Sequence, residues 1–272
     1  MSEASPSPLS QDFDTQKTDY FWKLGVHVKE VMQLHKDQGL WDRTPEGKRD
    51  WGNVSEHCLV EAARAREFGA LLGFDQDLLE DLITAAALHD VGKRNEVILA
   101  KSKGNSWETY EKADDRVRHV LLDADFSPRV VRLAGAVGHG SLQETERVLA
   151  KSELTADDVA FLVMHYIDDY TVGSEWAEPG HEVDGKKVSN FDARMDNNEA
   201  NEQYTNLNQE GRAIFDGRTT FETQRELGHA IESRLAEMIG NAVGEIVIPE
   251  NLPVYIDDQI KHRITEPTVK AA

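Results

Sequence analysis

Hydrophobic residues recur at intervals of three and four positions along most of this chain, which is the spacing of a helix face buried against a core. Leu24, Val28 and Val31 belong to the first such run, and Leu78 and Leu82 belong to a later one. The pattern indicates a mainly helical protein. It predicts helices over residues 20–40, 53–72, 75–90, 107–123, 127–139, 155–169 and 221–239.

Polar residues that suit helix N-termini stand at the start of several of these segments. Some form pairs three residues apart, the spacing of a capping box, in which each side chain accepts a hydrogen bond from the other residue's backbone N–H. Others are single N-caps. The predicted boxes are Asn53 with Glu56, Thr155 with Asp158 and Thr219 with Glu222, and the predicted single caps are Asp75 and Ser127, the latter followed by Pro128.

The same pattern divides the chain into four parts. Residues 1–19 lack a periodic apolar pattern and are predicted to be a mobile tail, whereas 20–172 form a helical domain. Residues 173–218 are rich in Asn, Asp, Glu and Gly and are predicted to be an irregular acidic loop with a hairpin turn at Asp184-Gly185. Loops of this length are usually lids, binding segments or disordered linkers, and we favour a partly ordered lid over a pure linker.

The last part, residues 219–272, is predicted to be one amphipathic helix followed by a tail. That helix would pack on the core or on another subunit, so a homo-oligomer is compatible with the sequence. Residues 246–249 are expected to be extended and the end of the chain frayed.

Composition limits the classes of partner. The formal net charge of −20 argues against nucleic acid or an anionic membrane as principal partner, because both require clustered Lys and Arg. The single cysteine, Cys58, excludes an intrachain disulfide and a thiolate zinc site. No apolar run is long enough for a signal core or a membrane span, so we expect a cytoplasmic protein.

The most informative stretch is Leu88-His89-Asp90-Val91-Gly92-Lys93, where an apolar helix ends in two adjacent metal-capable side chains. An imidazole and a carboxylate at the buried end of a helix are costly to desolvate, so such a pair usually persists because it binds something. A metal ion is the obvious candidate. Lys93 follows His89 by four residues and Asp90 by three, which would direct its cation over the same site.

Other metal-capable side chains occupy comparable positions. His57 lies at the edge of an apolar stripe, and His139 stands between two glycines at the end of a predicted helix. Asp168 ends a strongly apolar helix, and His165 could replace or support a ligand. Alone, each of these residues could be structural.

Together, His57, the His89-Asp90 dyad with Val91-Gly92-Lys93, and Asp168 resemble the HD-domain superfamily, whose signature is a histidine, an HD dyad and a distal aspartate. The separations along the chain from His57 to the dyad and from Asp90 to Asp168 are also similar to those of the family. The resemblance covers residues 53–171. It implies an all-α, HD-domain helical bundle with a metal site among its helices.

The resemblance also implies roles for particular residues. His57, His89, Asp90 and Asp168 would hold one divalent metal ion, and His119 and His139 would hold a second, with Asp90 bridging the pair. The metal would be Fe, Mn, Zn, Ni, Co or Mg. Asp90 and Lys93 are the predicted catalytic residues, and Lys93, Arg116 and Arg118 are predicted to bind substrate phosphate.

The leading hypothesis is a metal-dependent phosphohydrolase that acts on a nucleotide or another small phosphorylated metabolite. Two alternatives remain open. Some HD-superfamily proteins with six such ligands hold two irons and oxidise a C–H bond with O₂. A third possibility is a regulator that binds a nucleotide without turning it over.

Overall fold

The computed structural model describes residues 16–42, 53–176, 181–183, 186–188 and 190–265. Within these residues the fold is all-α apart from one antiparallel two-stranded hairpin, which confirms the predicted class. Residues 16–21 are also helical. The further elements are α2 (Val28–Asp37), α3 (Val54–Leu71), α4 (Gln76–Leu88), α5 (Lys93–Lys103), α6 (Trp107–Asp123), α7 (Pro128–Ala134), η1 (His139–Ser141), α8 (Leu142–Leu149), α9 (Ala156–Tyr170), β1 (His181–Val183), β2 (Lys186–Val188), α10 (Asn190–Ala200), η2 (Glu202–Tyr204), α11 (Thr205–Ile214), α12 (Thr220–Val243), η3 (Pro249–Asn251) and α13 (Leu252–Thr265).

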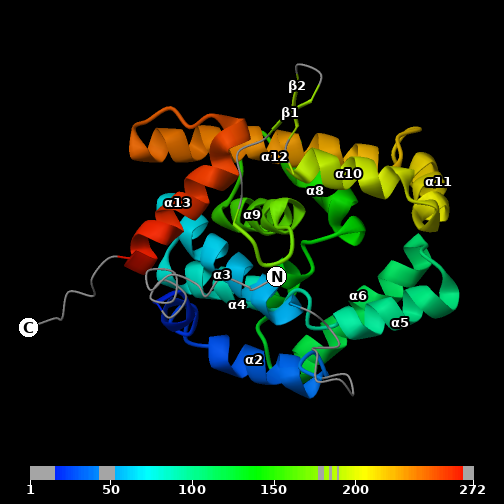
Figure 1. The fold of residues 1–272 in the computed structure, drawn as a ribbon, viewed down its shortest axis with the longest axis horizontal. Coiled ribbons are helices and arrows are strands. Elements are labelled where there is room, and N and C mark those ends of the chain that lie inside the picture. The colour runs from blue at the N-terminus through cyan, green and yellow to red at the C-terminus, as the bar shows by residue number, and fades with distance from the viewer. Residues whose placement is uncertain (1–15, 43–52, 177–180, 184–185, 189, 266–272) are drawn as a thin grey trace, which may run out of the picture.

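Helix α9 lies at the centre of the molecule and packs against α3, α4, α7, α8 and α12 (Figure 1). Its side chains are buried almost all round, as its continuous apolar sequence requires. Asp168 is an exception near the C-terminal end of the helix, where its side chain keeps 14% of its surface exposed. The central helix therefore carries one carboxylate to the edge of the core.

Helices α3 and α4 form an antiparallel pair joined by residues 72–75. Small buried residues on both helices, including Ala62 and Ala86, let the two backbones approach closely. Because the pair is antiparallel, the first turn of α3 lies beside the last turn of α4. This arrangement brings His57 and His89 together although nearly the whole of both helices separates them along the chain.

The predicted caps are largely present. Both Thr155 with Asp158 and Thr219 with Glu222 form complete capping boxes. Asp75 and Ser127 accept backbone hydrogen bonds as single N-caps. The predicted box at Asn53 is wrong: Asn53 is the N-cap residue but makes no capping hydrogen bond, and its side chain donates instead to Ser174.

The first predicted helix, over residues 20–40, is interrupted. Residues 16–21 are helical, a turn follows, and α2 begins only at Val28. At Gly25 a Cβ atom would lie 2.9 Å from the carboxylate of Glu80, and the Val26 N–H donates to the same carboxylate. The close approach of α4 thus requires a glycine at this position. The Glu80 carboxylate accepts the hydrogen bond of a backbone N–H that the helix break leaves without a helical partner.

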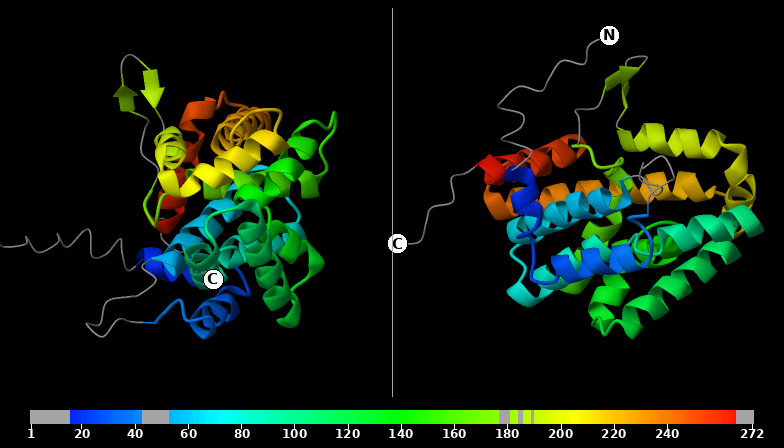
Figure 2. Two further views of the ribbon diagram at one scale, coloured as in Figure 1. Left: turned by 90° about the vertical axis from the view of Figure 1, so that its right-hand side faces the viewer. Right: turned by 60° about the horizontal axis from the view of Figure 1, so that its bottom comes forward.

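The acidic segment is more regular than predicted. It contains α10 and α11, and it begins with a hairpin that projects from the body (Figure 2). Val183 pairs with Lys186 across the predicted turn, while Asp184 and Gly185 themselves lie outside the described residues. Helix α13, which follows residues 246–249, was not predicted, although Leu252, Ile256 and Ile260 recur at four-residue spacing and are buried.

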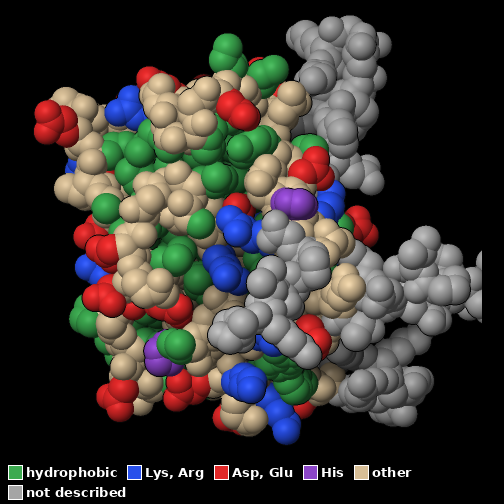
Figure 3. All heavy atoms as spheres, turned by 90° about the vertical axis from the view of Figure 1, so that its left-hand side faces the viewer, with side chains coloured by type: hydrophobic (Ala, Val, Ile, Leu, Met, Phe, Trp, Pro, Cys, Tyr) green, Lys and Arg blue, Asp and Glu red, His purple; other side chains and the backbone are tan. Residues whose placement is uncertain are grey.

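The outer face near α13 and the end of α12 gathers hydrophobic side chains in the upper half of Figure 3. Ile246, which follows α12, is 95% exposed and Ile248 is 51% exposed. A homo-oligomer stays a prediction. None of the helices that the structure describes is both long and apolar enough to cross a bilayer.

Candidate metal centre

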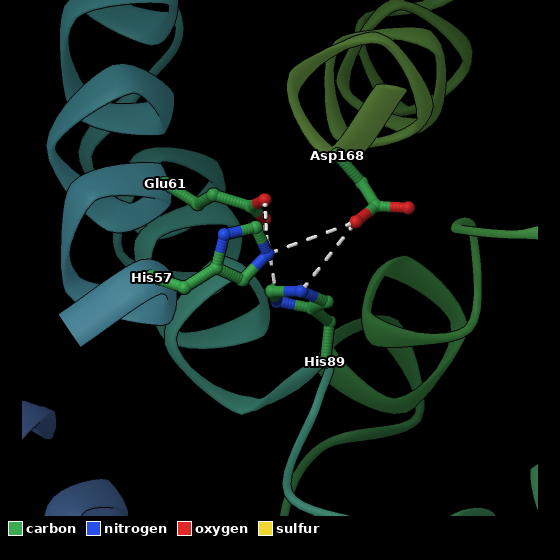
Figure 4. A group of neighbouring side chains, drawn as sticks. All are labelled: His57, Glu61, His89 and Asp168. Carbon is green, nitrogen blue, oxygen red and sulfur yellow. Dashed lines mark ion pairs between the residues drawn. The ribbon is translucent and has the colours of Figure 1, made fainter. Parts of the chain in front are cut away.

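The site forms where the start of α3, the end of α4 and the end of α9 meet (Figure 4). His57 and Glu61 come from α3, His89 follows α4, and Asp168 comes from α9. One ligand atom from each lies within 4.8 Å of the others. Among the described residues, this group of four is close enough to share a metal ion.

Both histidines are held by backbone carbonyl groups. The Nδ1 atom of His57 lies 2.6 Å from the carbonyl oxygen of Gly173, and Nδ1 of His89 lies 2.8 Å from that of Ala86. A carbonyl oxygen can only accept, so Nδ1 carries a proton in both rings. This anchoring, which is typical of metal-binding histidines, orients each ring and leaves Nε2 as the atom that faces the site.

The two Nε2 atoms face the same carboxylate oxygen. Oδ1 of Asp168 lies 3.9 Å from Nε2 of His57 and 3.8 Å from Nε2 of His89. The dyad partner Asp90 is adjacent, with Oδ2 3.9 Å from Nε2 of His89. The structure thus brings together four of the residues predicted from the sequence, namely His57, His89, Asp90 and Asp168.

Glu61 belongs to the site and was missed by sequence analysis. Its carboxylate is fully buried, with Oε1 2.9 Å from Nε2 of His57 and Oε2 3.3 Å from Nδ1 of His89. The missed signal was its position four residues after His57, which places both side chains on one face of α3.

The charges of neighbouring groups shift the pKa values of these residues. Burial alone would lower the pKa of His57, but the carboxylates of Glu61 and Asp168 more than offset it and raise the pKa to about 11. The pKa of His89 also rises well above its usual value, because Glu61, Cys58 and Asp90 together more than offset the effect of burial. Conversely, the interaction with His57 and the charge of Arg194 keep the pKa of Asp168 far below normal despite burial.

The donor set fits a divalent metal ion. Nε2 of His89 is buried and makes no hydrogen bond among the described residues, and the buried Glu61 carboxylate lies against the two imidazoles. A buried nitrogen without a hydrogen bond is costly, and here it lies within 4.8 Å of the other potential ligand atoms. Imidazole and carboxylate ligands without thiolate are compatible with several divalent metals, and Cys58 lies nearby only as a weak contact of His89 Nδ1 at 3.8 Å.

A cavity of about 630 Å³ opens beside this cluster. Lys93 lies in its wall, with Nζ 3.4 Å from Oδ1 of Asp90 and 3.3 Å from Oε1 of Glu96. The Asp90 carboxylate raises the pKa of Lys93, so the side chain is a cation at any ordinary pH. Charged residues around the cavity are Asp90, Lys93, Glu96, Asp114, Arg118, Arg132, Glu144, Asp168 and Arg194.

Comparisons of the chain with protein-family models, curated proteins and solved structures found no match.

The two histidines predicted to bind a second metal are not part of the cluster. His119 is exposed on α6 and its Nδ1 is hydrogen-bonded to the carbonyl oxygen of Asp115, because its place in the helical repeat turns it outward. His139 lines the cavity, but its ring packs edge-to-face between Tyr110 and Phe221. Burial lowers the pKa of His139 to about 4, so it is a neutral imidazole.

The predicted phosphate-binding arginines differ in position. Arg118 lines the cavity, whereas Arg116 lies at a separate small surface hollow beside Gly92. His165 is not a substitute ligand: its Nδ1 contacts the Ala136 carbonyl oxygen and its Nε2 lies 3.5 Å from Asp169. Arg194, which sequence analysis did not single out, donates to the carbonyl oxygens of Asp168 and Asp169 and so holds the end of α9.

Proposed function

We propose that this protein is a metal-dependent phosphohydrolase of the HD type that acts on a nucleotide or another small phosphorylated metabolite. One observation carries the proposal. Two histidines, each anchored through Nδ1 by a backbone carbonyl group, present Nε2 to Asp168 at the mouth of a polar cavity that also contains a cation, Lys93.

His57, His89 and Asp168 would hold the metal, with Asp90 beside them and Glu61 as a further ligand or as the buried charge beneath the imidazoles. A divalent metal ion lowers the pKa of water and polarises a phosphoryl oxygen, which is the chemistry that phosphate-ester hydrolysis requires. Lys93 would bind a phosphate oxygen by charge-assisted hydrogen bonding and orient the phosphorus toward the ligands. Arg118 is placed to assist from the cavity wall.

The donor set supports one metal ion rather than two. His119 stands away from the cluster, and His139 packs between aromatic rings. The di-iron oxygenase hypothesis requires six ligands around two irons, so we rank it below hydrolysis. The sensor hypothesis differs from both in predicting binding without turnover.

The test begins with metal content. Protein purified aerobically and anaerobically is analysed for bound metal, then reconstituted with Mn, Fe, Co, Ni, Zn or Mg and assayed against a panel of phosphate monoesters and phosphodiesters. We expect bound metal and release of phosphate or cleavage of a diester. Iron-dependent O₂ consumption with a mixed-valent iron signal would instead identify an oxygenase, and folded, metal-replete protein that is inert across the panel would overturn the proposal.

Histidine variants provide the matched control. His89→Ala removes one predicted ligand, and His119→Ala removes a histidine that the structure places outside the cluster. We expect the first variant to lose bound metal and activity with its helical circular dichroism retained, and the second to keep all three. Equal metal loss in both would contradict the single-metal site.

A further inference from the structure

Helices α5 and α6 form an antiparallel hairpin along one side of the cavity. They touch where a Cβ atom on Gly92 would lie 2.1 Å from the side chain of Val117. Glu96 lies four residues after Gly92 and Asp114 lies three residues before Val117, so both are about one turn, ~5.4 Å, from this contact in the same direction. Both carboxylates line the cavity that contains Lys93.

A glycine provides the space for the Asp114 carboxylate. A Cβ atom at Gly140 would lie 2.5 Å from Oδ2 of Asp114, so a larger residue there would displace the carboxylate. Gly140 belongs to η1, which packs against α6. The carboxylate therefore sits between α6 and the start of η1, and it remains open to the cavity.

The two carboxylates differ in their counter-charges. Nζ of Lys93 lies within 3.4 Å of carboxylate oxygens of both Asp90 and Glu96, so its positive charge forms ion pairs with both of them. Asp114 takes part in no ion pair or hydrogen bond within the part of the chain that the structure describes. Crowding by protein atoms and the neighbouring Glu96 and Asp115 carboxylates raise the pKa of Asp114 to about 7, and Arg118 and Lys93 only partly oppose this.

Two neighbouring carboxyl groups with different environments often divide acid and base roles. Glu96 is bonded to a cation and positions Lys93, whereas Asp114 can hold a proton at neutral pH. Tyr204 and Glu144 also line the cavity, as do Tyr110, which donates to Asn105, and His139, which is neutral. Neither Tyr110 nor His139 has the pKa of a proton donor that works near neutrality.

We propose that Asp114 is the general acid of the hydrolysis, donating its proton to the leaving-group oxygen as the phosphorus–oxygen bond breaks. The proposal rests on the phosphohydrolase function proposed above. A water oxygen forms the new bond to phosphorus, and the leaving group departs as a neutral alcohol. The proton that the water loses passes to phosphate or solvent, and the Asp114 carboxylate, which is open to the cavity, recovers a proton from solvent, so the enzyme is unchanged after each cycle.

The test compares two substrates whose leaving groups differ in their need for a proton. Benzyl phosphate releases an alcohol and requires protonation, whereas p-nitrophenyl phosphate releases a stable phenolate and does not. We expect Asp114→Asn to slow benzyl phosphate hydrolysis by roughly 10²-fold or more. The rate with p-nitrophenyl phosphate should change little. The wild-type rate with benzyl phosphate should also fall as pH rises through about 7, and the variant should lose this decline.

Two further variants separate this role from a structural one. Asp115→Asn makes the same charge change on the adjacent residue, which does not line the cavity, and should leave the p-nitrophenyl phosphate rate unchanged. Because the Asp115 carboxylate helps to raise the pKa of Asp114, this variant should move the decline with benzyl phosphate to lower pH but should not abolish it. Gly140→Ala should displace the Asp114 carboxylate and reproduce the selective loss with benzyl phosphate. Carbon-13 NMR of the metal-free protein should show an Asp114 carboxyl resonance that titrates near neutrality and disappears in Asp114→Asn.

The outcomes are distinct. If the wild-type protein hydrolyses both substrates and Asp114→Asn slows them equally, the general-acid role is overturned and the phosphohydrolase function stands. An Asp114 carboxyl group that titrates near pH 4, or equal effects of Asp115→Asn and Asp114→Asn, would also overturn it. Wild-type protein inert with both substrates and every metal would overturn the proposed function and this role together.

Discussion

The imidazole of His57 donates from Nδ1 to the carbonyl oxygen of Gly173, at a distance of 2.6 Å and 116 positions later in the chain. Gly173 adopts a φ of +58°, a conformation that L-residues adopt at a cost. The carbonyl group therefore points at His57 because a glycine allows the backbone to turn there. The orientation of one metal-capable ring depends on this turn.

Replacing Gly173 with alanine should weaken metal binding. The variant places a residue with a Cβ at positive φ, and that Cβ would lie 3.1 Å from the Asn53 side chain. We expect a loss of about 1 kcal/mol in the free energy of unfolding and a roughly 10–100-fold lower metal affinity, measured by urea unfolding and competitive titration with a chelating dye. Gly244→Ala is the matched control, since φ is +75° there and the residue ends α12. It should lose stability without losing metal affinity.

Glu61 should support the metal through its charge. Glu61→Gln keeps the shape of the side chain but removes the negative charge beneath both imidazoles. We expect the metal affinity to fall roughly 10–100-fold and the pKa of His57 to fall toward its ordinary value, as followed by isothermal titration and histidine NMR. Unchanged metal affinity would show that this carboxylate has a structural role in the core and does not support metal binding.

Metal affinity should rise with pH. The raised pKa values of His57, about 11, and of His89 mean that both rings are protonated in the metal-free protein at neutral pH. A metal ion must displace these protons from Nε2, so binding becomes tighter by ~10-fold per pH unit for each proton released, and weaker as pH falls. Calorimetric titrations in buffers with different ionisation enthalpies count the protons. An affinity independent of pH between 6 and 8 would contradict this arrangement.

A buried ion pair should dominate the stability of the C-terminal helix. Arg64 donates to Asp257 on α13 through two bonds of 2.8 and 2.6 Å, and both side chains are almost fully buried. Removing one partner, as in Asp257→Leu, should cost about 3–5 kcal/mol in the free energy of unfolding, because the Arg64 charge stays buried without the carboxylate that pairs with it. The double variant Arg64→Met with Asp257→Leu should recover most of this loss. Denaturant unfolding measures both, and equal losses in the two variants would contradict the explanation.

Local signals in the sequence were sufficient for most helices and for part of the site. Capping boxes such as Thr155 with Asp158 act within one helical turn, so they are visible without tertiary structure. The break near Gly25 was not visible, because its cause is Glu80 on α4, which is remote from Gly25 in the sequence. The helices inside the acidic segment were hidden by a polar composition that is typical of loops.

The difference between local signals and tertiary contacts also explains which residues of the site could be predicted. His57, His89 and Asp168 could be grouped because the resemblance to a family supplied their spatial relation. His119 was included by analogy, and only its outward position on α6 separates it from the cluster. Glu61 was overlooked because its role depends on two imidazoles from different helices.

The Arg64 side chain has a consequence for how the protein is made. Besides Asp257, it donates to Thr171 and to the carbonyl oxygen of Glu175, the two residues that flank the turn at Gly173. The segment that orients His57 is thus held by an arginine that forms an ion pair with Asp257 on α13. During synthesis, a nascent polypeptide shorter than 257 residues would contain every residue of the cluster but lack the carboxylate that pairs with Arg64, so the turn at Gly173 would be held less firmly than in a chain that contains α13.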